Sequence, residues 1–310
     1  MPSPSYLDTC QSGKLHQNLQ RLMEKLAACE LCPRRCRVNR LKDEKGFCNT
    51  GRKAMVSSYS PHFGEEDPLV GRFGSGTIFF TYCNLGCRFC QNYEISHEGM
   101  GQEVNPEGLA GIMLHLQNQG CHNINLVSPS HVVVPIMEAM PIAIEAGLKI
   151  PLVFNTGSYD LPETLKLLEG IVDIYMPDVK FSRERTARDL ANAPDYPEIS
   201  RQALLEMHRQ AGDLLLDEKG IATKGLLIRH LVMPGQLSET DEWLRFIAEQ
   251  VSTNSYINLM DQYHPCGSIH EHPSLSRKIS PEEYQQALTS ACNHGLQRLD
   301  RRGSFQLFTR

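Results

Sequence analysis

A regular alternation of short apolar runs and helix-forming segments occupies most of this 310-residue chain. From Thr77 onward, strand-like runs such as "TIFFTYC" and "KIPLVFNTG" alternate with helical stretches such as "NPEGLAGIMLHLQNQG". Repeated strand–helix units predict a parallel sheet with helices outside it. The predicted fold class is therefore α/β, as a partial (β/α)6 barrel of parallel strands with an N-terminal cysteine-rich arm. Rossmann-like winding of the same units is the alternative.

The expected elements can be placed by residue number. Strands are expected at residues 77–83, 122–128, 149–157, 171–181, 225–233 and 256–260. Helices are expected at residues 13–28, 105–120, 135–147, 162–170 and 198–210, with two more that begin at Ser238 and at Ser280. Asn105 is expected to cap its helix, and Asp241 to complete a capping box with Ser238.

Polar residues follow the expected strands at the ends where they terminate. Cys83 follows the first strand and Ser128 the second, and Asn155 and Thr156 end the third. Asp178 and Lys180 come late in the fourth strand, and His264 follows the sixth. In barrels and doubly wound sheets alike, the chemistry belongs at these carboxyl ends.

Charge and hydropathy exclude some classes of protein. The formal net charge is −5 and no run of Lys and Arg is longer than two, so a nucleic-acid partner is not expected. The most apolar stretch, residues 132–154, is interrupted by Glu138, Glu145 and Lys149, so no membrane span is expected. No signal peptide is visible at the N-terminus, which favours a cytoplasmic location.

The chain has 11 cysteines, and their distribution favours metal or redox chemistry over a disulfide framework. Cys83, Cys87 and Cys90 form the pattern C-x3-C-x2-C directly after the first expected strand. Three thiolates can bind three corners of a cubane iron–sulfur cluster and leave one iron open to a substrate, much as a catalytic zinc site is left one ligand short. A zinc knuckle with a borrowed fourth ligand is the alternative. Gly86 permits the tight turn between two of the ligands.

The same pattern, with the aromatic Phe89 just before the last cysteine, resembles the signature of the radical S-adenosylmethionine (SAM) superfamily. The chain as a whole resembles the iron–sulfur proteins that are similar to pyruvate formate-lyase activating enzyme. The stretches that carry this resemblance are "CELCPRRCRVNR", "CNLGCRFCQNYEIS", "INLVSPSHVV", "IVDIYMPDVKF", "LLIRHLVMPG" and "NLMDQYHP".

The resemblance implies a 4Fe-4S cluster on Cys83, Cys87 and Cys90, with SAM bound to the open iron. An external reductant such as flavodoxin or ferredoxin would supply the electron that cleaves SAM. The resulting 5′-deoxyadenosyl radical would then abstract hydrogen from a substrate, and the protein would position the reactants and exclude water.

The resemblance also implies a set of residues around the cofactor. Asp178 and Lys180 match the family's D-x-K motif, and Met176 matches a methionine that helps this Asp to hold a cation. Arg229 resembles a strand arginine near the cofactor, and a guanidinium suits a carboxylate. His264 resembles a histidine that contacts the ribose. Asn155 and Thr156 resemble a polar turn near the cation, in a different order.

One departure from the superfamily pattern lies at the end of the second expected strand. Many members have Gly-Gly-Glu there, and this chain has Ser128, Pro129, Ser130 and His131. Hydroxyls and carbonyls at Ser128 and Ser130 can still accept hydrogen bonds from the cofactor's amino group, but the carboxylate is missing. His131 is either a substitute for that group or an ordinary loop histidine.

A second cysteine group lies in the expected arm. Cys29, Cys32, Cys36 and Cys48 have the spacing C-x2-C-x3-C-x11-C, which is a strong metal-site pattern. A second 4Fe-4S cluster and a structural zinc ion fit this ligand set equally well. Cys266 lies close to His264 and is either a thiol that faces the substrate or a packing residue.

The sequence therefore predicts a radical SAM enzyme that abstracts hydrogen from an unidentified substrate, which can be a protein, a peptide or a small molecule. A glycyl-radical enzyme is one option for that substrate. The alternative is a non-enzymatic iron–sulfur or zinc protein for electron transfer or partner binding. The expected units are residues 1–70 (N-terminal helix and metal-binding arm), 71–275 (radical SAM partial barrel) and 276–310 (C-terminal helix and tail).

Overall fold

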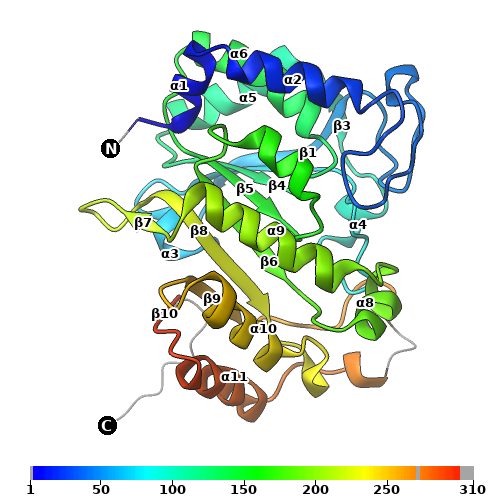
Figure 1. Ribbon diagram of the computed structural model, residues 1–310, viewed down its shortest axis with the longest axis vertical. Helices are drawn as coiled ribbons and strands as arrows, with labels where there is room; N and C mark the ends of the chain where they lie inside the picture. The colour runs from blue at the N-terminus through cyan, green and yellow to red at the C-terminus, as the bar shows by residue number, and fades with distance from the viewer. Residues whose placement is uncertain (1–2, 270–272, 301–310) are drawn as a thin grey trace.

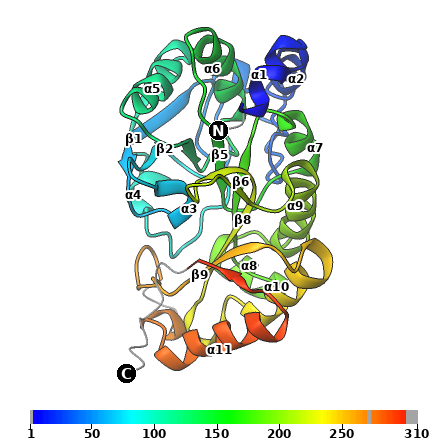
Figure 2. The same ribbon diagram turned by 90° about the vertical axis from the view of Figure 1, so that its left-hand side faces the viewer.

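The computed structural model describes residues 3–269 and 273–300, which form a curved sheet with helices around it (Figures 1 and 2). The strands are β1 (Ala54–His62), β2 (Ser75–Phe80), β3 (Gln102–Val104), β4 (Ile124–Val127), β5 (Leu152–Thr156), β6 (Ile174–Val179), β7 (Leu215–Leu216), β8 (Ala222–Leu231), β9 (Tyr256–Met260) and β10 (Arg298–Leu299). The helices are α1 (Ser5–Gln11), α2 (Lys14–Glu24), α3 (Asp67–Val70), α4 (Tyr93–Ser96), α5 (Pro106–Asn118), α6 (Val133–Glu145), α7 (Pro162–Leu165), α8 (Glu184–Ala191), α9 (Tyr196–Ala211), α10 (Thr240–Phe246) and α11 (Pro281–Asn293). Shorter helical turns are η1 (Arg40–Lys42), η2 (Lys166–Leu168), η3 (Pro234–Gln236), η4 (Ile247–Val251) and η5 (Pro273–Leu275).

The topology of the sheet confirms the predicted fold class. Its strand order is β10-β9-β8-β6-β5-β4-β2-β1-β3, with β7 paired to β8. The six predicted strands, β2, β4, β5, β6, β8 and β9, are parallel and adjacent in chain order. A doubly wound sheet would reverse direction at a switch point, so this order indicates a singly wound partial barrel. In the described part of the chain, β3 and β10 lie at opposite edges and the sheet is open.

The two faces of the sheet explain why its strands read as nearly continuous apolar runs. Phe154 and Tyr175 point outward, with ring centroids 6.0 Å apart, into the main core beneath the helices. Figures 1 and 2 show α5, α6, α7 and α9 around this outer side. Leu69 of α3, Met176 and Leu227 belong to a smaller apolar cluster on the inner side. Parallel strands that are buried on both faces need apolar residues at successive positions.

The expected helix ends are partly confirmed. The Asn105 side chain accepts a hydrogen bond from the Gly108 N–H, so it caps α5 as predicted. The predicted capping box of Ser238 and Asp241 is wrong, because α10 begins at Thr240 after Glu239, whose φ is +47°. The Ser238 hydroxyl instead accepts a hydrogen bond from the Met233 N–H. The last helix, α11, has a complete capping box formed by Ser280 and Glu283.

Several elements were not predicted. Strand β1 pairs antiparallel with β2, and the three-residue β3 pairs antiparallel with β1. They extend the sheet beyond the first β/α unit, and neither has a clear apolar alternation, because β1 has no buried residue after Val56 and β3 has none. Helix α8 is short, and four of its eight residues are charged. Apolar alternation therefore gave no sign of β1 and β3, and α8 is too short to give a clear helical period.

The N-terminal helices pack on the barrel, and the cysteine-rich segment follows them. The Tyr6 hydroxyl donates to the Ile150 carbonyl at 2.9 Å, and the Asn18 amide donates to the Leu167 carbonyl at 3.0 Å. Residues 29–51 are irregular apart from η1. The division into units 1–70, 71–275 and 276–310 stays a prediction, and residues 301–310 of the third unit lie outside the described residues. No helix in residues 3–269 or 273–300 is long and apolar enough to cross a bilayer.

Candidate active site

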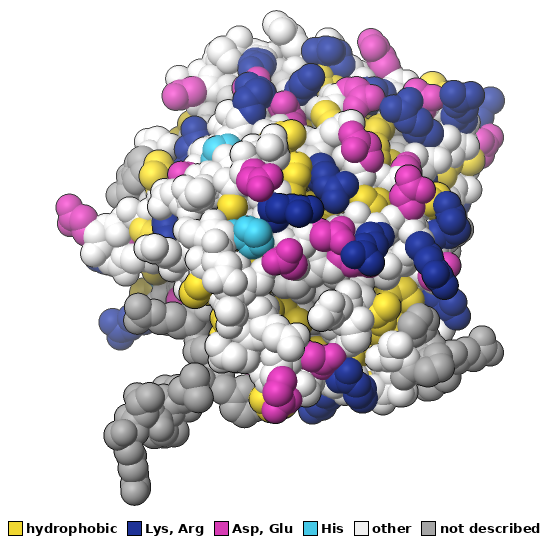
Figure 3. All heavy atoms as spheres, turned by 60° about the horizontal axis from the view of Figure 1, so that its bottom comes forward, with side chains coloured by type: hydrophobic (Ala, Val, Ile, Leu, Met, Phe, Trp, Pro, Cys, Tyr) yellow, Lys and Arg dark blue, Asp and Glu magenta, His cyan; other side chains and the backbone are white. Residues whose placement is uncertain are grey.

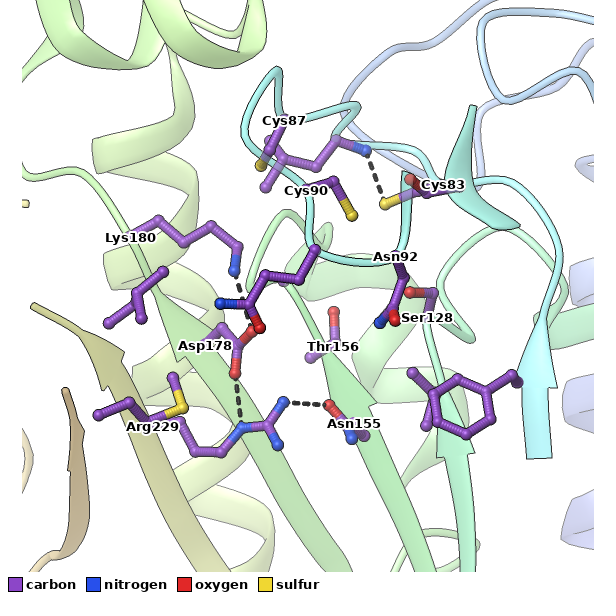
Figure 4. Close-up of a pocket in the computed structure, with 18 of the residues that line it drawn as sticks. Cys83, Cys87, Cys90, Asn92, Ser128, Asn155, Thr156, Asp178, Lys180 and Arg229 are labelled. Carbon is purple, nitrogen blue, oxygen red and sulfur yellow. Dashed lines mark hydrogen bonds and ion pairs between the residues drawn. The ribbon is translucent and has the colours of Figure 1, made fainter. Parts of the chain in front are cut away.

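A cavity of about 360 Å³ lies at the carboxyl ends of the parallel strands and collects most of the predicted site residues (Figure 4). The predicted residues that line it are Cys83, Cys87, Phe89, Cys90, Ser128, Asn155, Thr156, Asp178, Lys180 and Arg229. Its volume lies in the range of cofactor and substrate sites. Residues that are more than 140 positions apart in the sequence therefore meet in one pocket.

The three-cysteine loop forms one wall of this cavity, directly after β2. Gly86 has a φ of +66°, which L side chains rarely adopt, so the predicted need for glycine between Cys83 and Cys87 is confirmed. The Leu85 N–H donates to the Cys83 sulfur at 3.4 Å. Burial raises the pKa of the Cys83 and Cys87 thiols, so a metal is needed to hold them as thiolates at neutral pH.

Phe89 holds the three-cysteine loop against the hydrophobic core. Its side chain is 3% exposed and packs edge-on against Phe181, with ring centroids 5.8 Å apart. Tyr263 lies on another side of the ring at 6.4 Å. The aromatic residue before the last cysteine thus anchors the loop in the core and also lines the cavity.

Asp178 is the central charge on the opposite wall. The Lys180 Nζ lies 2.9 Å from one of its oxygens and the Arg229 Nε lies 2.6 Å from the other (Figure 4). Burial alone would raise the pKa of Asp178, but Arg229 and Lys180 hold it at about 2. Asp178 therefore stays ionised and keeps both cations in place.

Arg229 also contacts Asn155 and two glutamates that the sequence analysis did not identify. Its Nη2 donates to the Asn155 Oδ1 at 2.8 Å, and its Nη1 lies 3.3 Å from the Glu65 Oε2 and 3.9 Å from the Glu66 Oε1. Burial raises the pKa of both glutamates, and Arg229 partly offsets that rise. Glu65 and Glu66 precede the first predicted strand in a stretch that reads as an ordinary acidic loop, so no local signal could have found them.

Ser130, Thr156 and Asp160 form a second polar group beside the cavity. The Ser130 and Thr156 hydroxyls lie 3.0 Å apart, and the Thr156 hydroxyl donates to Asp160 at 2.6 Å. Burial raises the pKa of Asp160 to about 6. Ser128 lines the cavity with a φ of +58°, whereas Ser130 lies behind Thr156.

Three other candidate residues are not among the described residues that line the cavity. Met176 lies on the same face of β6 as Asp178 but is fully buried in the inner apolar cluster. His264 is exposed, with its Nδ1 3.4 Å from the Gln262 carbonyl oxygen. The Cys266 thiol contacts the Phe89 carbonyl at 3.2 Å, behind the loop. Their predicted roles stay predictions.

The second cysteine group surrounds a cavity of its own, of about 10 Å³, which Cys29, Cys32, Cys36 and Cys48 all line. Burial raises the pKa of the Cys32 thiol to about 12. His131 also lines this small cavity, and its Nε2 lies 2.9 Å from the Thr81 carbonyl oxygen. His131 is therefore a buried residue beside the arm and does not line the large cavity.

Comparison with known proteins identifies the family of this chain. The family described as the Radical SAM superfamily matches residues 77–247, which is more than half of the chain, so the protein belongs to that superfamily. An uncharacterized protein of Methanocaldococcus jannaschii is 32% identical over 278 residues, which cover 86% of this chain and 75% of the relative.

Two solved structures are similar to this chain at lower sequence identity. A radical SAM methyltransferase from Sphaerobacter thermophilus has a TM-score of 0.49 and 14% identity, over 73% of this chain and 66% of that one. HydG, a maturase of the FeFe-hydrogenase, has a TM-score of 0.45 and 15% identity, over 70% of this chain and 48% of that one. The chain thus spans just under two thirds of the first structure and about half of the second.

Membership of the superfamily points to an enzyme that uses a 4Fe-4S cluster, SAM and an external reductant. No group of three or more His, Cys, Asp and Glu side chains in residues 3–269 and 273–300 is arranged to hold a single metal ion. The large cavity nevertheless suits the family's cofactors. It has three thiols on one wall, and its other wall offers carboxylates, cations and hydroxyls to a cofactor that carries both an ammonium and a carboxylate.

Proposed function

We propose that this protein cleaves SAM reductively at a 4Fe-4S cluster held by Cys83, Cys87 and Cys90, and that it abstracts hydrogen from a bound substrate. The observation that carries this proposal is the shared cavity, which the three thiols and the Asp178–Arg229 ion pair both line. When bound, the cluster and SAM supply the electron transfer and the 5′-deoxyadenosyl radical. The chain supplies positioning and a site that limits access of water.

The polar wall is proposed to orient SAM. Lys180 and Arg229 provide donors for a carboxylate, and Asp178 and Glu65 provide acceptors for an ammonium. Because Asp178 holds both cations, their donors are already in place when the cofactor arrives. Such preorganisation lowers the ordering cost of binding.

We also propose a subgroup within the radical SAM superfamily. The D-x-K motif at Asp178 and Lys180, with Arg229 beside it, supports cofactor binding similar to that of pyruvate formate-lyase activating enzyme. The substrate is proposed to be a protein, a peptide or a small molecule, and a glycyl-radical enzyme is one option. Figure 3 shows basic and acidic side chains interspersed over one face of the molecule, which gives no support to a nucleic-acid partner there.

The release of 5′-deoxyadenosine tests this function. The protein is purified without oxygen, reconstituted with iron and sulfide, reduced, and mixed with SAM. We expect release by the wild type and a loss to background in Cys87→Ala. Cys292→Ala, at an exposed cysteine outside both cavities, is the matched control and should behave as the wild type.

The result that would contradict the proposal is equally specific. It is the absence of 5′-deoxyadenosine from wild-type protein that holds an intact, reduced 4Fe-4S cluster and has been offered extracts that contain candidate substrates. Release that persists in Cys87→Ala would also count against the assigned ligands.

A further inference from the structure

We infer that Cys29, Cys32, Cys36 and Cys48 hold a second iron–sulfur cluster, and that the buried Arg40 is its counter-charge. Nothing in the superfamily match, which begins at residue 77, covers this arm. The inference is independent of SAM chemistry and depends on three features of the arm: an unbalanced cation, an unpartnered donor on that cation, and the size of the cavity.

Arg40 is the first feature. It is 1% exposed, and its Nε and Nη1 donate to the carbonyl oxygens of Gly51 at 2.8 Å and His131 at 2.7 Å. Among the described residues no carboxylate forms an ion pair with it. A buried guanidinium without a negative partner is strongly unfavourable. Four neutral thiols would leave it unbalanced, whereas thiolates that bind a metal centre would supply the missing negative charge.

Two polar atoms beside the arm are buried without a hydrogen-bond partner. They are the Arg40 Nη2 and the His131 Nδ1, and both residues line the four-cysteine cavity. The Nε2 of His131 lies 2.9 Å from the Thr81 carbonyl oxygen, which can only accept, so in the neutral ring the Nδ1 is the acceptor nitrogen. An anionic centre cannot donate to this acceptor nitrogen, so the missing ligand is indicated by the Arg40 Nη2 alone, a buried donor without an acceptor. An anionic centre would accept a hydrogen bond from the Arg40 Nη2.

The size of the cavity distinguishes a cluster from a zinc ion. Thiolates at about 2.3 Å from one zinc ion leave no space for a water-sized sphere between them. The cavity that the four cysteines line measures about 10 Å³, close to the volume that one water-sized probe occupies. Gly46 keeps it open, because a Cβ there would lie 2.6 Å from the Cys36 Cβ and 2.7 Å from its sulfur. The four cysteines therefore line a space larger than a single zinc ion would leave between its ligands.

The arm is also connected directly to the three-cysteine loop. Arg34 donates to the carbonyl oxygens of Asn84 at 2.9 Å and Leu85 at 2.8 Å, both between the first two ligands of that loop. His131 contacts the carbonyl of Thr81, two residues before Cys83. Cys48 and Cys83 line the same surface groove. A cluster in the arm would thus lie next to the catalytic one, where it could pass electrons to it.

The first test removes the catalytic ligands. The Cys83→Ala, Cys87→Ala, Cys90→Ala triple variant is reconstituted without oxygen, and its iron, sulfide and zinc are measured together with its electron paramagnetic resonance spectrum. We expect about four iron and four sulfide per chain and a reducible cluster signal. A further Cys32→Ala change should remove them. About one zinc per chain without iron, or no metal at all, would overturn the inference.

If the triple variant does not fold, single variants give the same information. Wild-type protein should bind about eight iron per chain, and Cys32→Ala and Cys87→Ala should each bind about four. Equal iron contents in the wild type and Cys32→Ala would overturn the inference.

The second test addresses Arg40 through the reduction potential of the arm cluster. Reduction adds a negative charge, so loss of a nearby buried cation should disfavour it. Arg40→Met should lower the midpoint potential, and Arg40→Lys should lower it less because it keeps the charge. Arg35→Met is the control, since Arg35 is half exposed and pairs with Glu163. An unchanged potential in an Arg40→Met protein that still holds its cluster would overturn the role of Arg40.

Discussion

Two buried arginines, Arg229 in the barrel and Arg40 in the arm, show how differently the two thiol sites are built. Arg229 lies within 4 Å of Asp178, Glu65 and Glu66, so its charge is balanced by the protein itself. Arg40 donates to two backbone carbonyls and forms no ion pair within the described residues. The barrel site is therefore electrostatically complete before a cofactor binds, whereas the arm needs an anionic centre to complete it.

Loss of Arg229 should have the largest effect on the stability of the metal-free protein. Arg229→Met leaves Asp178, Glu65 and Glu66 buried without their main cation, which costs about 3–5 kcal/mol of unfolding free energy. Chemical denaturation at pH 7 measures this loss. Arg183→Met, at an arginine that is 66% exposed and pairs with Glu242, is the control and should change stability little.

The same measurement on Arg40→Met sharpens the comparison. In metal-free protein, its cost should be smaller than that of Arg229→Met, because the change removes a cation that has no carboxylate partner. In reconstituted protein the cost should grow. Equal costs for the two variants, with and without metal, would show that the two sites do not differ in the way we describe.

Asp160 provides the next largest effect, as a buried carboxylate with hydrogen bonds but no ion pair in the described residues. Its pKa rises from 3.8 to about 6 on folding, so the ionised form is less stable in the folded protein. The penalty appears as pH rises from about 4 through 6 and reaches about 3 kcal/mol above pH 7. Asp160→Asn, which keeps the acceptor for Thr156, should therefore raise the free energy of unfolding at pH 8. No gain at pH 8 over pH 4 would contradict this.

The pKa shift of Asp178 should change the stability of the protein in the opposite direction. Its pKa falls from 3.8 to about 2 on folding, because Arg229 and Lys180 outweigh the effect of burial. This difference stabilises the protein by about 2 kcal/mol above pH 4, and the contribution is lost as pH falls from about 4 to 2. Acid titration of stability should show this loss in the wild type and not in Asp178→Asn.

The smallest effect is expected where the arm contacts the loop. Arg34→Ala removes hydrogen bonds to the carbonyls of Asn84 and Leu85 in the loop, and to those of Ala191 and Asn192 outside it, each of about 1 kcal/mol. The three-cysteine loop should then be held less firmly, so the KM for SAM should rise several-fold with the iron content of the loop unchanged. Arg35→Ala, next to it, is the control. An unchanged KM would show that the arm does not position the loop.

Much of the barrel could be predicted because its signals are local. Strand β5 and helix α5 are marked by apolar runs, by Asn105 at the cap and by Pro106 at the first turn. The capping box at Ser238 was wrong because its sequence pattern also fits a turn, and here the Ser238 hydroxyl bonds back to Met233. The antiparallel β1 and β3 were missed because β1 has no buried residue after Val56 and β3 has only three residues, so neither carries an apolar pattern.

The sequence by itself determined the parallel β/α order, the positions of both cysteine groups and the placement of Asp178 and Lys180 at a strand end. These features follow from the periodicity of apolar residues and from short spacings between motif residues, and both can be recognised within one local stretch of sequence. Only the tertiary structure decided that Glu65 and Glu66 lie against Arg229, that His131 belongs to the arm, and that Arg40 is buried without a carboxylate. Charge balance in a folded interior is a property of side chains brought together from distant segments, so no local stretch of sequence records it.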